Sequence, residues 1–144
     1  MARPPSRAVC ERLLDRAREV RKRAYAPGSR FRVGAAVRTA SGRVFVGCNV
    51  ENASFGLTIC AERAAVCAAV AAGERVITTV AVVAGRAGAV SPCGACRQVL
   101  AEFALKGGAL WVVTAGARGS AKVVALHDLL PAAFTFEDVV RGRG

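Results

Sequence analysis

The hydrophobic positions near the N-terminus recur at the spacing of an amphipathic helix. Over residues 6–24, apolar side chains such as Val9 and Leu13 occur every three or four positions, with arginines between them. The turn-like "YAPGS" that follows ends this predicted helix. Two β-like runs come next, "FRVGAAVRTA" at 31–40 and "RVFVGCNVE" at 43–51, and the Ser-Gly pair between them predicts a β-hairpin.

The rest of the chain alternates between helical and β-like segments. An alanine-rich helix is expected to start near Cys60 and to stop at Gly73, and a second helix follows the Ser-Pro pair in "AVSPCGACRQVLAEFALKGG". Apolar, β-branched runs predict three further strands. These runs are "VITTVAVVAG" at 76–85, "ALWVVTAG" at 109–116 and "AKVVAL" at 121–126.

This order of elements predicts an α/β fold. Helix, strand, strand, helix, strand, helix, strand, strand is typical of a three-layer sandwich, in which a mixed five-stranded sheet carries helices on both faces. A chain of 144 residues without a linker or an internal repeat predicts a single domain over residues 1–144.

Composition and charge narrow the class of protein. The chain is 53% hydrophobic and 22% charged, which is typical of a globular protein. Its net charge is +11, and residues 1–38 contribute most of it, with eleven Arg and Lys residues against three acidic ones. This segment either attracts anions or nucleic acid or is a solvated basic helix. The sequence lacks an apolar run of membrane-spanning length and a secretory signal, so we expect a cytoplasmic protein without membrane association.

Three of the six cysteines are candidate metal ligands. Cys93 and Cys96 form "PCGAC", and positions i and i+3 share one helix face, so both sulfurs can reach one metal from the first turn. The positive end of the helix dipole favours their thiolates. Alone, this motif also fits a redox pair or half of a structural zinc site. Cys60 is the third candidate. The other three cysteines stand singly in apolar surroundings and are expected to be packing residues of the core or near the surface; they are Cys10, Cys48 and Cys67.

The number of candidate ligands distinguishes a catalytic metal site from a structural one. A structural zinc ion takes four protein ligands, and the only histidine, His127, is expected at a helix start or on the surface. Three cysteine ligands would leave one position for water, as in catalytic zinc sites. Glu62, two residues after Cys60, is placed to hydrogen-bond that water and to move its protons, although in isolation it reads as an ordinary carboxylate of a first helical turn.

Several motifs, and the order in which they occur, resemble those of the small homotetrameric cytidine deaminases of the zinc-dependent deaminase superfamily. The resemblance spans roughly residues 25–140 and rests on "FRVGAAV", "GCNVENASFG", "TICAER", "SPCGACRQVLAEF" and "LLPAAFTFEDV". It implies a cytidine deaminase-like fold, with a zinc core at about 31–115 and a C-terminal segment at about 120–140. It also implies one Zn²⁺ per subunit and hydrolysis of cytidine and 2′-deoxycytidine to uridine and 2′-deoxyuridine plus ammonia, in pyrimidine salvage.

The same resemblance assigns roles at the metal. The ligands are Cys60, Cys93 and Cys96. Glu62 first accepts a proton from the bound water and then donates protons to the cytosine ring and to its leaving amine. Three thiolates give the zinc site a formal charge of −1, and Arg63 resembles the family arginine that hydrogen-bonds them. Arg97 either assists Arg63 or lies on the surface.

Substrate contacts are implied along the hairpin and the C-terminal segment. Asn49 and Glu51 face the same way in an extended strand and match the residues that bind the ribose, chiefly its 3′-hydroxyl. A carboxylate there accepts from a free hydroxyl and repels a phosphodiester, although such a pair can also simply cap a turn. The aromatic residue expected against the pyrimidine is Phe31, unless it only packs in the core. Neighbouring subunits of a homotetramer are expected to supply Ala53, Phe55 and Phe134.

Some positions depart from the family pattern, and other functions remain open. Gly28 and Phe55 stand where relatives often have tyrosine, and Phe136 replaces a common proline, while Trp111 is expected in the core or an interface.

A deaminase of a blasticidin S-type nucleoside antibiotic is the alternative enzyme, and the "NVEN" segment, which matches residues that bind an ordinary ribose, argues against it. A zinc-stabilised nucleic-acid-binding module would need a fourth ligand and surface aromatics, and a polynucleotide-editing deaminase would need a strand channel.

Overall fold

A five-stranded mixed sheet forms the middle layer of the computed structural model, which describes residues 2–85 and 88–142. The strand order is β2-β1-β3-β4-β5, and only the β3–β4 pair is parallel. The strands are β1 (Val33–Thr39), β2 (Val44–Cys48), β3 (Ile77–Ala84), β4 (Trp111–Ala115) and β5 (Lys122–Ala125). The predicted sheet and its hairpin are therefore confirmed.

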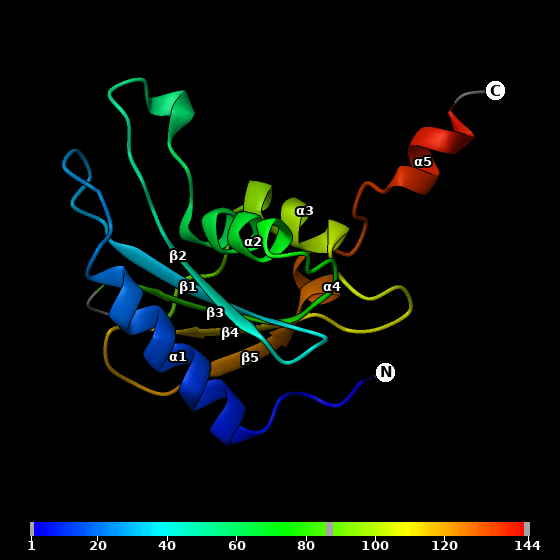
Figure 1. Cartoon of the computed structure of the whole chain (residues 1–144), viewed down its shortest axis with the longest axis horizontal. Coiled ribbons are helices and arrows are strands. Elements are labelled where there is room, and N and C mark those ends of the chain that lie inside the picture. The colour runs from blue at the N-terminus through cyan, green and yellow to red at the C-terminus, as the bar shows by residue number, and fades with distance from the viewer. Residues whose placement is uncertain (1, 86–87, 143–144) are drawn as a thin grey trace.

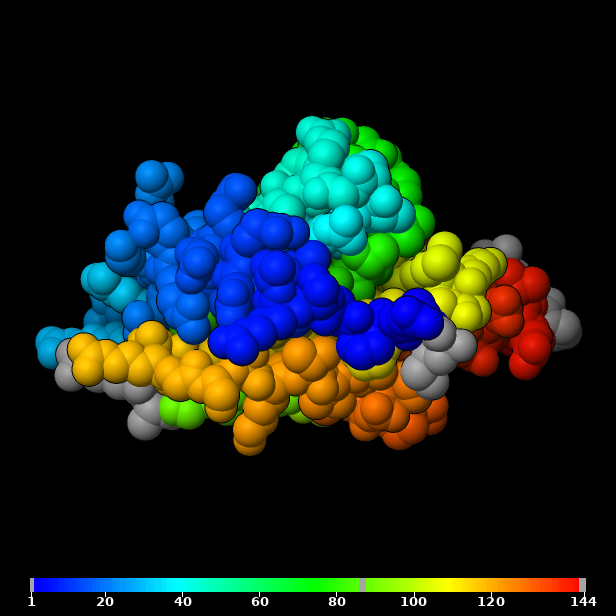
Figure 2. Space-filling model, turned by 90° about the horizontal axis from the view of Figure 1, so that it is seen from below, coloured from blue at the N-terminus to red at the C-terminus, as the bar shows by residue number. Residues whose placement is uncertain are grey.

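Helices cover both faces of this sheet, as predicted (Figure 1). Helix α1 (Arg7–Arg21) lies on one face, and α2 (Ala61–Ala71) and α3 (Gly94–Glu102) lie on the other. Seen from below, α1 runs across its face of the molecule, and the C-terminal segment lies at one end (Figure 2). Three short helices were not predicted. They are η1 (Phe55–Leu57), α4 (Leu126–Leu129) and α5 (Phe136–Arg141).

Two hydrophobic clusters hold the three layers together. The alternation of side chains along β3 sends Ala81 toward α1 and Val80 toward α2 and α3. Small residues let the layers approach closely: a Cβ at Gly34 would overlap the carbonyl oxygen of Ala17 in α1, and one at Gly47 would overlap the backbone of α2. The helices that carry the candidate ligands are therefore packed directly against the sheet.

The ends of the helices have identifiable causes. Ser6 caps α1 by accepting a hydrogen bond from the N–H of Val9 at 3.3 Å, and α1 ends at Arg21, three residues before the predicted limit. The side chain of Thr135 caps α5 through a reciprocal capping box with Asp138. None of the described helices is long and apolar enough to cross a membrane.

Several single residues lie as the sequence indicated. All six cysteines are free, with Cys10 buried within α1 and Cys67 exposed on α2. His127 is exposed in α4 and contacts Asp128 at 2.9 Å. Trp111 is half-buried in β4, and its indole nitrogen is buried without a hydrogen-bond partner among the described residues. The single-domain prediction stays a prediction, and its limits at residues 1 and 144 lie outside the described part of the chain.

Candidate metal centre and active site

Three thiols meet where two helices begin. Cys60 and Cys93 are the N-cap residues of α2 and α3, and Cys96 lies in the first turn of α3. Their sulfur atoms all lie within 4.8 Å of one another, and Cys60 Sγ is 4.0 Å from Cys93 Sγ. Tetrahedral zinc with Zn–S bonds of about 2.3 Å separates its sulfur ligands by about 3.8 Å. The three thiols therefore fit a zinc ion, as the sequence predicted.

The protein surroundings of the thiols differ from one to the next. Burial raises the pKa of Cys96 well above its ordinary value, and the nearby Glu62 carboxylate raises it further. Burial also acts on Cys93, but hydrogen bonds from the backbone N–H and the thiol of Cys96 outweigh it, so the pKa of Cys93 is lowered. Helix α3 thus favours a thiolate at its cap, whereas the Cys96 thiolate needs a cation beside it.

Glu62 is the buried carboxylate of the site. It is the second residue of α2, and its side chain is only 5% exposed. Burial raises the pKa of Glu62, and hydrogen bonds to its carboxylate and the charge of Arg63 oppose this only in part. A carboxyl group with a raised pKa can both accept and return a proton near neutral pH. This property suits the role expected for Glu62.

Two arginines follow the ligand cysteines, and only one contacts sulfur. Arg63 Nη2 lies 3.4 Å from Cys60 Sγ and 3.4 Å from the carbonyl oxygen of Thr58. Arg97 instead donates to the carbonyl oxygens of Pro92 at 2.8 Å and Leu129 at 3.0 Å. It is half-buried and ties α3 to α4, so neither of its two expected roles describes it.

A cavity of about 280 Å³ opens beside the thiols. It brings together the thiols of Cys60 and Cys93, the carboxylate of Glu62 and three of the predicted substrate residues. Apolar side chains from β1, β3 and the loop before α3 form much of the remaining wall. The predicted substrate residues on this wall are Phe31, Asn49 and Glu51, and the further polar ones are Ser29, Thr58 and Ser91.

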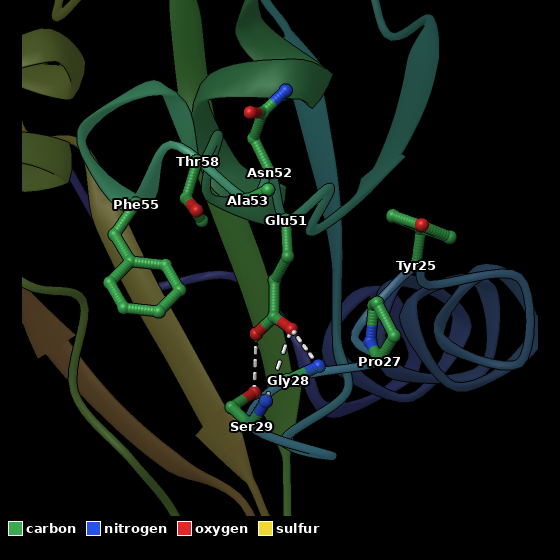
Figure 3. Close-up of a pocket in the computed structure, with 9 residues that line it drawn as sticks. All are labelled: Tyr25, Pro27, Gly28, Ser29, Glu51, Asn52, Ala53, Phe55 and Thr58. Atoms are coloured by element: carbon green, nitrogen blue, oxygen red, sulfur yellow. Dashed lines mark hydrogen bonds between the residues drawn. The ribbon is translucent and has the colours of Figure 1, made fainter.

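A second, larger cavity of about 850 Å³ adjoins the first and shares Ser29, Glu51 and Thr58 with it (Figure 3). Ala53 and Phe55 lie on its wall. The structure does not bring Phe134 to either of these two cavities. That side chain is 62% exposed beyond α4, and its carbonyl oxygen accepts a hydrogen bond from Gln98 at 2.7 Å.

The side-chain amide of Asn49 also holds the backbone at the start of β1, and its predicted contact with the ribose stays a prediction. Its Oδ1 accepts from the N–H of Val33 at 2.8 Å, and its Nδ2 donates to the carbonyl oxygen of Phe31 at 2.8 Å. The amide therefore fixes the start of β1 and retains one N–H and one lone pair for another partner. Sequence reasoning also missed Ser29, for which the only signal was its place between a Pro-Gly turn and a strand.

Comparisons with known proteins agree with this geometry. The family described as "Cytidine and deoxycytidylate deaminase zinc-binding region" matches residues 8–110. A cytidine deaminase of Sporosarcina psychrophila is 43% identical over 90% of this chain and 93% of its own, and one of Mycobacterium tuberculosis is 47% identical over 83% and 85%.

Solved structures are similar over the same extent. A crystal structure of the cytidine deaminase from Burkholderia pseudomallei has a TM-score of 0.80 and 48% identity, covering 86% of this chain and 98% of that one. The cytidine deaminase from Mycobacterium tuberculosis has a TM-score of 0.74 and 42% identity, covering 87% and 96%. The fold and the three-thiol centre thus define a zinc-binding hydrolase of the deaminase type. The chain belongs to the cytidine and deoxycytidylate deaminase family.

Proposed function

We propose that this protein hydrolytically deaminates cytidine and 2′-deoxycytidine to uridine and 2′-deoxyuridine, releasing ammonia, in pyrimidine salvage. One observation supports this most directly: three thiols lie within 4.8 Å of one another, and two of them, Cys60 and Cys93, border one small pocket together with the buried residue Glu62. The named relatives, which match most of this chain, are cytidine deaminases, and cytidine is a free nucleoside.

The chemistry divides between a metal and one carboxylate. Held by Cys60, Cys93 and Cys96, Zn²⁺ would supply a Lewis acid that lowers the pKa of a water molecule. Glu62 takes one proton as the water oxygen bonds to C4 of cytosine, and it delivers that proton to N3. Glu62 then moves the second water proton to the amino group on C4. The bond between C4 and this amino nitrogen breaks, so ammonia leaves and a carbonyl group remains at C4. Burial keeps bulk water from competing for these protons.

The other pocket residues hold the nucleoside. Phe31 offers an aromatic face to the pyrimidine, and Glu51 accepts a hydrogen bond from the 3′-hydroxyl. A phosphodiester at that hydroxyl would have no proton to donate and would place like charges together. The pocket therefore favours a free nucleoside over a polynucleotide, and nothing in its geometry favours a nucleic-acid-binding module.

We further propose a homotetramer in which Ala53, Phe55 and Phe134 complete the pockets of neighbouring subunits. The support is exposure: Phe55 is 85% exposed and Phe134 is 62% exposed in the single chain, which is costly for aromatic side chains in water. The six free cysteines favour a reducing compartment, and we place the protein in the cytoplasm.

The test is ammonia release from the purified, zinc-loaded protein. The substrates are cytidine, 2′-deoxycytidine, cytidine 5′-monophosphate, a cytosine oligonucleotide and blasticidin S, with Glu62→Gln as the matched control. We expect release from the two nucleosides only, and its loss in the variant. Release from blasticidin S or the oligonucleotide alone would replace this proposal with one of the alternatives. Sedimentation at several protein concentrations tests the tetramer separately.

A further inference from the structure

The carboxylate of Glu51 is held by the loop that precedes β1 (Figure 3). Its Oε1 accepts from the backbone N–H groups of Gly28 at 2.9 Å and Ser29 at 3.1 Å. Its Oε2 accepts a hydrogen bond from the Ser29 hydroxyl. The same hydroxyl oxygen accepts from the N–H of Phe31 at 3.0 Å. Ser29 thus contacts two of the residues expected to hold the nucleoside, Glu51 and Phe31.

Counting acceptor positions shows what remains for a substrate. A carboxylate offers about four lone-pair positions, two on each oxygen. Two N–H donors occupy both positions of Oε1, and the Ser29 hydroxyl occupies one position of Oε2. Glu51 therefore has one acceptor position left, and it lies on the oxygen that Ser29 fixes. A hydroxyl has a single proton, so Ser29 cannot donate to Glu51 and to a substrate at once.

The loop itself is held in an unusual shape. Arg30, between Ser29 and Phe31, has a φ of 56°, in the left-handed region that disfavours residues with a side chain. The N–H of Arg30 closes a turn on the carbonyl oxygen of Ala26 at 3.0 Å. Such a conformation persists only where neighbouring contacts hold it, and the contacts with Glu51 are adjacent to it. The loop and Glu51 therefore stabilise each other's geometry.

We propose that Ser29 is a positioning residue, which aims the remaining acceptor position of Glu51 at one sugar hydroxyl, the 3′-hydroxyl. This inference rests on the proposed function. Because only one position is left, Glu51 offers no acceptor to the 2′-hydroxyl. The carboxylate then treats cytidine and 2′-deoxycytidine alike and discriminates against 3′-deoxycytidine.

Ser29→Ala tests this proposal, because it keeps the backbone N–H and removes the hydroxyl alone. We expect kcat/KM for cytidine and for 2′-deoxycytidine to fall about tenfold, mainly through KM, since the contact is made before and during the reaction. Ser29→Thr keeps a hydroxyl and should restore most of the loss. With 3′-deoxycytidine, whose sugar lacks the partner of Glu51, Ser29→Ala should change kcat/KM by less than about twofold.

Two results would overturn the inference. One is a Ser29→Ala enzyme that matches the wild type on cytidine, and the other is an equal fold-loss on 3′-deoxycytidine, which would indicate general loosening of the loop. Thermal unfolding of both variants shows whether they fold. If the wild type released ammonia from no nucleoside, the proposed function would fall instead. Equilibrium binding of cytidine and 3′-deoxycytidine to the zinc-loaded variants would then still decide the role of Ser29.

Discussion

Replacing Arg63 with glutamine removes a guanidinium that contacts a ligand sulfur. Zn²⁺ with three thiolates carries a formal charge of −1, and Arg63 Nη2 lies 3.4 Å from Cys60 Sγ. At that distance, two unit charges interact by about 1 kcal/mol in water and about 5 kcal/mol at an effective dielectric of 20. A hydrogen bond to a charged group contributes about 1.5–3 kcal/mol, within this range. Because Arg63 is half-buried, we take the lower end, which corresponds to a loss of roughly tenfold in zinc affinity.

The assay is competition for zinc with a chromophoric chelator, together with kcat for cytidine. The matched control is Arg97→Gln, because Arg97 follows a ligand cysteine on α3 but donates only to the carbonyl oxygens of Pro92 and Leu129. We expect Arg63→Gln to weaken zinc binding and to lower kcat, and Arg97→Gln to change thermal stability with zinc affinity nearly unchanged. Equal losses of zinc affinity in the two variants would refute the assignment of Arg63 to the thiolates.

Three further predictions concern the proton carrier, the metal and the packing. Glu62→Gln should lower kcat by about 10²–10⁴-fold while zinc content, measured by elemental analysis, stays at that of the wild type; loss of zinc would contradict a purely proton-moving role. Burial raises the pKa of Cys96, so zinc must displace the proton of this thiol when it binds. Zinc affinity should therefore increase between about pH 6 and pH 8 in competition titrations, and an affinity that does not change with pH would contradict this prediction. Gly34→Ala should lower the free energy of unfolding by about 1–3 kcal/mol or more in urea titrations, because its Cβ would overlap the Ala17 carbonyl, whereas Gly56→Ala, with no atom within 4 Å, should leave it nearly unchanged.

The long elements of the fold could be predicted because their patterns are local. A β-like run located β1, an apolar, β-branched run located β3, and the three-to-four spacing of apolar residues located α1. The short helices α4 and α5 escaped, since four to six residues carry too little periodicity and depend on tertiary contacts.

The residues of the candidate site also differ in whether a local sequence pattern reveals them. The thiols could be placed because two of them share one helix turn and the third follows a loop into another helix start. Asn49 was placed on the correct side of the strand, but its hydrogen bonds to the backbone near Val33 depend on how the hairpin closes. Apart from its place after a Pro-Gly turn, Ser29 carries no sequence signal, because its partner Glu51 lies 22 positions away.

The sheet separates helix α1 from the thiols of the candidate metal centre. Helix α1, which carries five arginines and three acidic residues, lies on one face, and helices α2 and α3, whose starts carry the thiols, lie on the other (Figure 1). Stacked layers are about 10 Å apart, and the Debye length at physiological ionic strength is about 8 Å. Charges on α1 are therefore largely screened from the metal ligands. Solubility, surface immobilisation and attachment of labels can be adjusted on α1 with little electrostatic effect on the reacting groups.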